Sequence, residues 1–308
     1  MAARIVIGTC SWADAGFVAD WYPKGLPAAQ RLPFYAERFE GVEINSSFYA
    51  VPERAQAQHW AQVTPAGFSF DVKLHRLLSR HAAALDSLPP ELRDEARTNE
   101  RGRVQLTPEL ERGVLDRVIE AVAPLERAGK LRALLLQLSP AFSPRRHELA
   151  ELDPLIERLA PRRVAIELRN RDWVGEERVR ATLDHLADRG AVFVCVDAPP
   201  GDHHTLMPPI DAVTRDDLAY VRAHGRNTDG YLRGRSVAER FGWVYSDDEL
   251  NELAGRVRNL AADTEEVRVM FNNNRSNDAP LAARRMREIF GQPPGALARP
   301  EEAQLRLA

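Results

Sequence analysis

Short apolar runs alternate with longer amphipathic stretches along most of the chain. The runs have the length and the β-branched or aromatic content of buried strands. They cover residues 4–9, 41–45, 68–73, 133–138, 163–168, 191–197, 218–224 and 267–273. Helical periodicity marks the stretches 27–39, 54–63, 107–129, 146–160, 176–189, 246–262 and 278–290.

Strands that alternate with helices predict βαβ units and a parallel sheet. Eight such units in 308 residues favour a single α/β domain, a TIM-barrel-like (β/α)8 barrel, over two open-sheet domains. The sixth connection, APPGDHHTLMPPIDAVTRDD, contains no convincing helix, so we expect an irregular sixth unit. The barrel is expected to cover residues 1–292, with a Pro-containing C-terminal tail at 293–308 and a surface excursion at 76–106.

Side chains alternate between the two faces of a strand, and on one of these faces they become polar toward the carboxyl end. In VEIN, Val42 and Ile44 alternate with Glu43 and Asn45. Both faces of a barrel strand are covered, so charged residues on one face are buried. Such residues either form ion pairs or take part in catalysis or binding. Enzymes with this fold place their chemistry where the strands end. The same alternation predicts further inward-facing polar residues, namely Ser69, Asp71, Lys73, His75, Gln137, Glu167, Arg169, Cys195, Asp197, Tyr220, Arg222, His224, Asn272 and Asn274.

Carboxylates and one lysine on this face suit acid–base catalysis. Lys73 is one of three lysines in a chain with 39 arginines. A compact ammonium whose pKa shifts on burial suits direct contact with a reacting group or a substrate anion. The predicted catalytic residues are Glu43, Lys73, Glu167 and Asp197.

The other inward-facing side chains are predicted to bind substrate. Arginine captures phosphate or carboxylate with two hydrogen bonds, and aromatic residues just beyond the strand ends are expected to form a stacking wall. The predicted binding residues are Trp12, Asn45, Tyr49, His75, Gln137, Arg169, Trp173, Arg222, His224, Asn272 and Asn274. We therefore expect an enzyme that binds an anionic small molecule or nucleotide and performs hydrolysis or elimination.

Other functions are compatible with the same residues. A phosphoesterase or nuclease would bind Mg²⁺ or Mn²⁺ with Glu43, Glu167, Asp197 and His224, although no HxH or ExxH spacing supports this and no cofactor is clearly implied. A Schiff-base lyase would use the Lys73 amine, and a noncatalytic binding protein would need only the cations. Ion pairs such as Glu167 with Arg222 would give the cluster a purely structural role.

The loop after the seventh strand, GRNTDGYLRGR, is expected to cover this site together with RFGWVYS. It contains Gly225, Gly230 and Gly234, and Gly242 lies in the second segment. Glycines permit the bending that loops over barrel mouths need. The sequence therefore predicts a lid.

Charge and composition limit the partners. The net charge is −3 and basic residues are interspersed with acidic ones, which argues against a nucleic-acid footprint. No apolar run approaches the roughly 18 residues that a membrane helix needs. The first strand starts at Arg4, which leaves no room for a signal peptide, so we expect a cytoplasmic protein. Two cysteines, Cys10 and Cys195, provide neither a disulfide framework nor a CxxC metal site.

Several segments carry a family resemblance when they are taken together and in order. They are GTCSW, WYPKG, FEGVEINSSFYAVP, Trp60, TPAGFSFDVKLH, LLLQLSPAFSP, AIELRNRDW, YVRAHG, WVYSDDELNELAGRV and VMFNNN. From Gly8 to Ala282 the chain resembles the YecE-like family, domain of unknown function family seventy-two. The resemblance implies a TIM-barrel-like fold and no established reaction. The chain departs from the family pattern at Cys10 and Ser11, where Ser and Gly are usual, and at Asn170, where a His is common.

Overall fold

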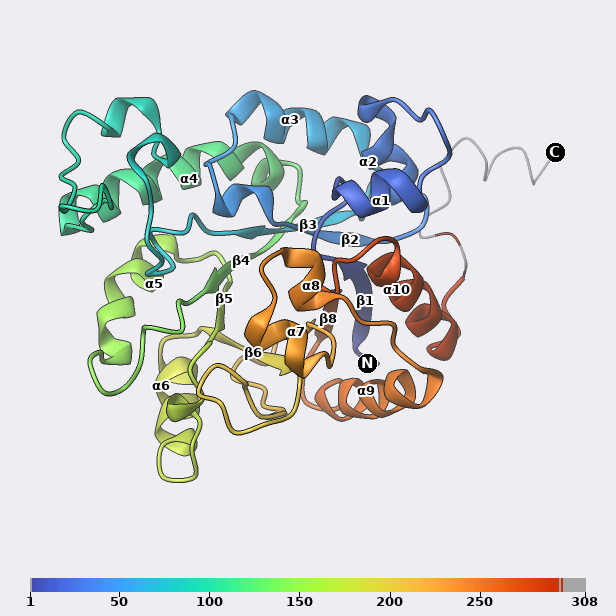
Figure 1. Cartoon of the computed structure of the whole chain (residues 1–308). Helices are drawn as coiled ribbons and strands as arrows, with labels where there is room; N and C mark the ends of the chain where they lie inside the picture. Colours follow the sequence, from blue (N-terminus) through green and yellow to red (C-terminus); the bar gives the residue numbers. More distant parts are fainter. Residues whose placement is uncertain (1, 294, 296–308) are drawn as a thin grey trace.

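Eight parallel strands close into a barrel in chain order (Figure 1). The structure is a computed structural model that describes residues 2–293 and 295. The strands are β1 (Arg4–Thr9), β2 (Gly41–Ile44), β3 (Ser69–Lys73), β4 (Leu131–Gln137), β5 (Val164–Glu167), β6 (Val192–Asp197), β7 (Ala219–Ala223) and β8 (Glu266–Phe271). Each strand end lies within two residues of the expected one, and the predicted TIM-barrel-like α/β fold is confirmed.

Helices surround this barrel. They are α1 (Ala15–Asp20), α2 (Ala28–Ala36), α3 (Arg54–Val63), α4 (Pro108–Arg127), α5 (Asp153–Leu159), α6 (Val179–Asp188), α7 (Thr228–Arg233), α8 (Val237–Phe241), α9 (Asp247–Leu260) and α10 (Asp278–Ile289). Thr107 caps α4, and Ser246 and Glu249 form a capping box at the start of α9. The predicted helices are present, with 146–160 divided into the 3₁₀ helix η4 (Leu149–Leu152) and α5, whereas α1, α7 and α8 were not predicted.

The sixth unit of the barrel is irregular, as expected. Residues 198–218, all of which the structure describes, contain no helix between β6 and β7. A loop therefore takes the place of the usual helix on the outer face of β6. Within the described residues, no helix is both long enough and apolar enough to cross a membrane.

The segment 76–106 contributes to the core more than a surface excursion would. It contains the short 3₁₀ helices η2 (Leu85–Ser87) and η3 (Pro90–Leu92), and Leu78 and Leu88 are buried. The predicted tail at 293–308 lies outside the described residues, apart from 293 and 295.

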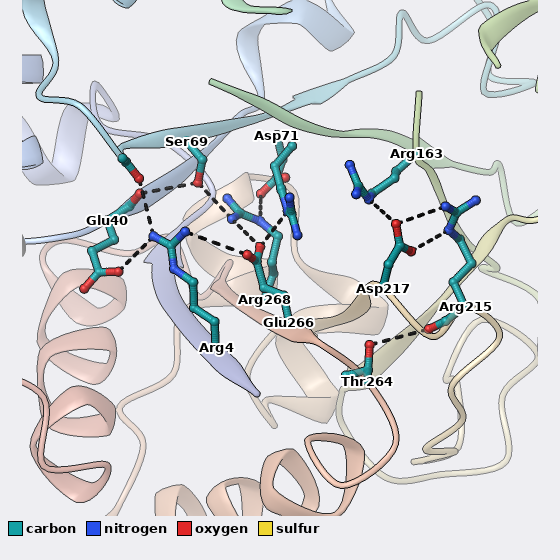
Figure 2. Close-up of polar contacts among 12 residues, drawn as sticks. Arg4, Glu40, Ser69, Asp71, Arg163, Arg215, Asp217, Thr264, Glu266 and Arg268 are labelled. Carbon is teal, nitrogen blue, oxygen red and sulfur yellow. Dashed lines mark hydrogen bonds and ion pairs between the residues drawn. The ribbon is translucent and has the colours of Figure 1, made fainter. Parts of the chain in front are cut away.

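A network of paired charges fills the barrel where the strands begin (Figure 2). Arg268 on β8 donates to Asp71 at 2.7 Å, to Ser69 at 2.9 Å and to Glu266 at 3.2 Å. A Cβ at Gly41 would stand 2.7 Å from the Arg268 guanidinium, so a larger residue here would displace that side chain. We call Ser69, Asp71, Glu266 and Arg268 the floor of the barrel.

Candidate active site at the carboxyl ends of the strands

A buried ion triad joins β2, β5 and β7 above the floor. Arg222 donates to Glu43 from Nε at 2.9 Å and from Nη2 at 2.7 Å, and its Nη1 donates to Glu167. All three side chains are fully buried. Every Arg222 nitrogen thus has a carboxylate partner, so this arginine holds two carboxylates together in the lumen.

Glu167 has the larger set of partners. It accepts hydrogen bonds from Gln137 at 2.9 Å and His224 at 3.0 Å, and Arg169 lies 3.5 Å away. Burial alone would raise the pKa of Glu167, but Arg222, His224 and Arg169 together hold that pKa well below its usual range. Glu167 is therefore ionised and unsuited to act as a general acid.

The contacts of His224 determine its tautomer. The amide nitrogen of Asn45 donates to the carbonyl of Cys10 at 2.7 Å and to Asn272 Oδ1 at 3.3 Å, which turns Asn272 Nδ2 toward His224 Nδ1 at 3.0 Å. Nδ1 therefore accepts, and Nε2 carries the proton that is donated to Glu167. Burial lowers the pKa of His224, so the ring is neutral.

Lys73 is a cation of the lumen that has no carboxylate bound to it. It ends β3 with 8% of its surface exposed, and no hydrogen bond or ion pair joins its ammonium to another described residue. Nζ lies 4.2 Å from the centre of the Phe48 ring. Burial and then Arg222 lower the pKa of Lys73 to about 8, against the opposing effect of Glu43 and Glu167. The amine is thus partly unprotonated near neutral pH.

The segment after β7 covers this cluster, as the sequence predicted. Arg169 Nη2 donates to the hydroxyl of Tyr231 on α7, and the guanidinium carbon lies 5.3 Å from the ring centre. The ring of Phe241 on α8 lies 5.7 Å from that of His224. Figure 1 shows α7 and α8 in orange, in front of the strands. We call residues 228–241 the lid.

The structure brings most of the predicted site residues into one connected cluster in the barrel mouth. Its members are Glu43, Asn45, Lys73, Gln137, Glu167, Arg169, Arg222, His224, Asn272 and Asn274. They come from six different strands or strand ends. The alternation rule therefore located a real convergence of side chains.

Asp197 does not belong to this cluster, so the prediction of an inward-facing Asp197 is wrong. In the sheet register Val196 pairs with Arg222, and paired residues of neighbouring strands point to the same face. Because Arg222 points into the barrel, Val196 also points inward and Asp197 points outward. Asp197 accepts from Tyr245 at 2.6 Å and from Arg226 at 2.8 Å. The same strand turns Cys195 outward, where its thiol contacts the carbonyl of Ala212 at 3.6 Å. With no helix after β6, polar residues can cover this outer face.

Two of the three residues of the predicted aromatic wall, Trp12 and Trp173, lie away from the cluster. Trp12 packs edge-on against Trp60 with ring centres 5.4 Å apart, in the layer between barrel and helices. Trp173 donates to the carbonyl of Phe142 at 2.8 Å and stacks on its ring. Tyr49 is 57% exposed. Alternation continues for a short distance past some strand ends but not through the 3₁₀ helices η1 (Ser46–Phe48) and η5 (Arg171–Trp173), so it does not determine the direction of Tyr49 or Trp173.

His75 was expected in the site but supports the segment 76–106 instead. Its Nε2 lies 3.0 Å from the carbonyl of Ser87. His81 lies at the mouth in its place, with its ring centre 5.1 Å from that of Phe48. Burial, and then Lys73 and Arg169, lower the pKa of His81 to about 4. No pattern in the sequence points to His81, since it lies in an irregular segment.

Cys10 also lies at the cluster, although it was not predicted there, whereas Asn170 does not. The Cys10 sulfur lies 3.5 Å from Arg222 Nη2, and burial raises the pKa of the thiol. The alternation on β1 would have found it, because Val6 pairs with Arg268 and so Val6, Gly8 and Cys10 share the inward phase. Asn170, where the family commonly has His, accepts from the Asp172 amide at 3.0 Å and lies outside the cluster.

Metal ligation was a possible use of these carboxylates. In residues 2–293 and 295, no three His, Cys, Asp or Glu side chains are grouped so that they could hold a metal ion. The arrangement of these side chains therefore gives no support to the Mg²⁺ or Mn²⁺ hypothesis.

A closed parallel barrel with a buried ionic cluster where its strands end defines a TIM-barrel-like α/β protein with a candidate active site. The chain belongs to the family described as "Protein of unknown function DUF72", whose model matches residues 6–305, and this confirms the predicted resemblance.

Relatives of known sequence and structure agree with this assignment. The chain is 26% identical over 290 residues to UPF0759 protein YunF of Bacillus subtilis (strain 168), across 93% of this chain and 94% of that protein. A DUF72 family protein of Enterococcus faecalis V583 is 24% identical with a TM-score of 0.74, covering 94% of this chain and 99% of that one. A DUF72 family protein of Thermotoga maritima MSB8 is 25% identical with a TM-score of 0.75, covering 94% and 100%. The family assignment rests on the family model, and the solved structures agree with the fold.

Proposed function

We propose that this protein is an enzyme that binds an anionic small molecule in the barrel mouth and transfers a proton to or from it during hydrolysis or elimination. The observation that carries the proposal is Lys73, a buried ammonium with no hydrogen bond or ion pair to any described residue. It stands at the end of β3, where enzymes of this fold place their catalytic groups.

The charge of the cluster supports an anionic ligand. Lys73, Arg169 and Arg222 face the two carboxylates of Glu43 and Glu167, and the neutral His224 adds no charge. One positive charge is therefore in excess whenever Lys73 is protonated. An anion beside Lys73 and Arg169 would balance it.

The pKa of Lys73 supports proton transfer by this residue. A pKa of about 8 lies near neutral pH, the range in which a group both accepts and returns protons. The low pKa of Glu167 makes this residue an ionised acceptor that orients His224. In this proposal Lys73 exchanges the proton, and Glu43 and Glu167 stabilise its charged form.

The same amine supports Schiff-base chemistry as a second candidate. An unprotonated Lys73 can attack a substrate carbonyl carbon and release water to form an imine. Borohydride then adds hydride to the imine and fixes the substrate as a secondary amine. Mass spectrometry would find the adduct on Lys73 and not on the exposed Lys24 if this candidate holds.

Anion binding by matched lysine variants tests the leading proposal. Lys130 is also buried, but its ammonium donates to the carbonyls of Ala61 and Thr64, both at 2.6 Å, beside the start of β4. Calorimetric titration with phosphate- and carboxylate-bearing compounds should show at least tenfold weaker binding in Lys73→Met and unchanged binding in Lys130→Met. Equal binding by Lys73→Met and the wild type would refute the proposal. Turnover of a bound compound separates an enzyme from a noncatalytic binding protein.

A further inference from the structure

We propose that the ligand of this site is a polyhydroxylated anion, a small molecule with a carboxylate or phosphate at one end and hydroxyl groups along its chain. This inference rests on the proposed function and adds the chemistry of the uncharged part of the ligand. It comes from buried polar atoms of the barrel mouth whose hydrogen-bonding capacity the protein leaves unused.

Asn45 presents one unused acceptor. Its Nδ2 donates to the carbonyl of Cys10 at 2.7 Å, and since a carbonyl only accepts, this contact fixes which end of the amide is the nitrogen. Oδ1 is buried and has no hydrogen-bond partner among residues 2–293 and 295. Asn45 therefore needs a donor from outside the protein.

Asn274 presents a second unused acceptor beside the first. Its Nδ2 donates to Asn272 Oδ1 at 3.4 Å, the same oxygen that accepts from Asn45 at 3.3 Å. Its own Oδ1 is buried and, in the described part of the chain, lacks a hydrogen-bond partner. The two amides that carry the free oxygens thus share Asn272 as a hydrogen-bond partner.

Hydroxyl groups are the donors that fit these two oxygens. Ligand carboxylates and phosphates only accept when ionised, so neither pairs with an amide oxygen. An ammonium group would donate, but the cluster already has an excess positive charge when Lys73 is protonated. Two neighbouring hydroxyls of one ligand satisfy both oxygens without adding charge.

The anionic end of the ligand belongs on the other side of His224. Lys73 has no bound partner, and Arg169 Nε is buried without a hydrogen-bond partner among the residues described. A chain of contacts connects the two sides: Asn272 to His224 at 3.0 Å, His224 to Glu167 at 3.0 Å, and Glu167 to Arg169 at 3.5 Å. In this proposal one small molecule bridges the cations and the free acceptors.

Pairs of ligands that differ only in their hydroxyl groups test this inference. Gluconate is compared with hexanoate, and glucitol 6-phosphate with hexyl phosphate, by calorimetry. None of these compounds contains a carbonyl that could react with Lys73. We expect the hydroxylated member of at least one pair to bind tenfold tighter or more, since two additional hydrogen bonds are made. Which of the two pairs binds shows whether the anionic group is a carboxylate or a phosphate. Glucitol, which has the hydroxyl groups but no anionic group, should bind far more weakly.

Variants of Asn274 show whether the two acceptors cause the preference. Asn274→Leu should lower the affinity ratio of the hydroxylated to the plain anion severalfold, and this ratio is the readout because Asn274 also donates to Asn272 and its loss affects both anions. Asn274→Asp keeps an acceptor oxygen and should keep the ratio. Lys73→Met should weaken both members of a pair equally. Equal affinities within both pairs in the wild type would overturn the polyhydroxylated ligand alone, whereas no binding of any anion would overturn the proposed function as well.

Discussion

The two buried lysines differ in what surrounds them, although their exposure is nearly the same. Lys73 is 8% exposed and Lys130 is 7% exposed. Lys130 donates to the carbonyls of Ala61 and Thr64 and to the Thr64 hydroxyl at 2.6–2.9 Å, whereas Lys73 has no such partner in the described structure. Burial of a charge without a partner opposes folding. Lys73 is thus a residue whose presence needs a reason other than stability.

Replacement of each lysine by Met should separate these roles. Lys130→Met leaves acceptors unpaired, and we expect it to lower the free energy of unfolding by about 2–3 kcal/mol. Lys73→Met removes an unpaired charge while Arg222 still pairs Glu43 and Glu167, so the free energy of unfolding should stay the same or rise. Urea unfolding measures both. A loss of stability in Lys73→Met as large as that in Lys130→Met would make Lys73 structural.

The pH dependence of stability gives a second test of Lys73. Its pKa is about 8 in the folded protein, against 10.5 for an unperturbed lysine, so between these values the unfolded chain binds more protons. Wild-type stability should therefore rise relative to Lys73→Met as the pH increases from 8 to 10.5. Below pH 8 Lys73 is charged in both the folded and the unfolded protein, and burial of this charge lowers the free energy of unfolding by about 3 kcal/mol. Urea unfolding of both proteins at about pH 7, 9 and 10 measures the change, and a constant difference would mean that the pKa is not lowered.

At the scale of elements, strand alternation predicted much of the candidate site. It placed Glu43, Lys73, Glu167 and Asn272 in one lumen because a closed parallel sheet leaves two directions for each side chain. It failed at Asp197 because the rule assumes that an apolar helix covers the outer face of every strand. The missing sixth helix was visible in the sequence, but its consequence for β6 required the register.

Residues outside the strands were beyond this reasoning for a physical reason. His81 reaches the mouth from a long connecting segment, whose path depends on tertiary packing and not on local periodicity. The predictions for Trp12 and Trp173 were wrong because these positions also lack periodicity. Barrel topology and the covering segment after β7 follow from local patterns, whereas the walls of the site depend on packing between distant segments.

The lid provides a prediction at this scale. Tyr231→Phe removes the hydroxyl that accepts from Arg169 and should let the lid open more often. Trypsin should then cleave severalfold faster after Arg233 and Arg235, which are exposed in the lid. Cleavage after Arg101, exposed in the segment 76–106, provides the internal control and should be unchanged. A rate that rises equally at all three sites would indicate general destabilisation, and unchanged rates would mean that the hydroxyl does not hold the lid closed.

Across the whole molecule, the two ends of the barrel use buried charge differently. In the floor, Arg268 pairs with Asp71 and Glu266 (Figure 2). Arg132 adds a 2.9 Å bond to Glu266. The floor also contains two polar atoms without a hydrogen-bond partner, Asp71 Oδ1 and Arg268 Nη2, but these two charges are joined in an ion pair. In the mouth, Lys73 forms no ion pair with any described residue. This division agrees with the general rule that one end of such barrels serves stability and the other serves chemistry.

Arg268→Met tests that division. Removal of the guanidinium leaves Asp71 buried without its partner, and we expect the free energy of unfolding at pH 7 to fall by about 3–5 kcal/mol. Anion affinity of the folded variant should match the wild type, because the mouth triad of Arg222, Glu43 and Glu167 is intact. Arg222→Met is the matched variant in the mouth and should weaken anion binding as well as stability.

The pH response of Arg268→Met should identify Asp71 as the cause of the lost stability. Burial already raises the pKa of Asp71 to about 6, against the lowering effect of Arg268, and without Arg268 this pKa should rise further. The folded variant then binds a proton that the unfolded chain, with an ordinary Asp pKa, has released, so its stability increases as the pH falls. Urea unfolding should accordingly show a smaller deficit relative to the wild type at about pH 5 than at about pH 8. Asp71→Asn in the same background should remove this pH dependence, and a deficit that is equal at both pH values would place the lost stability elsewhere in the floor.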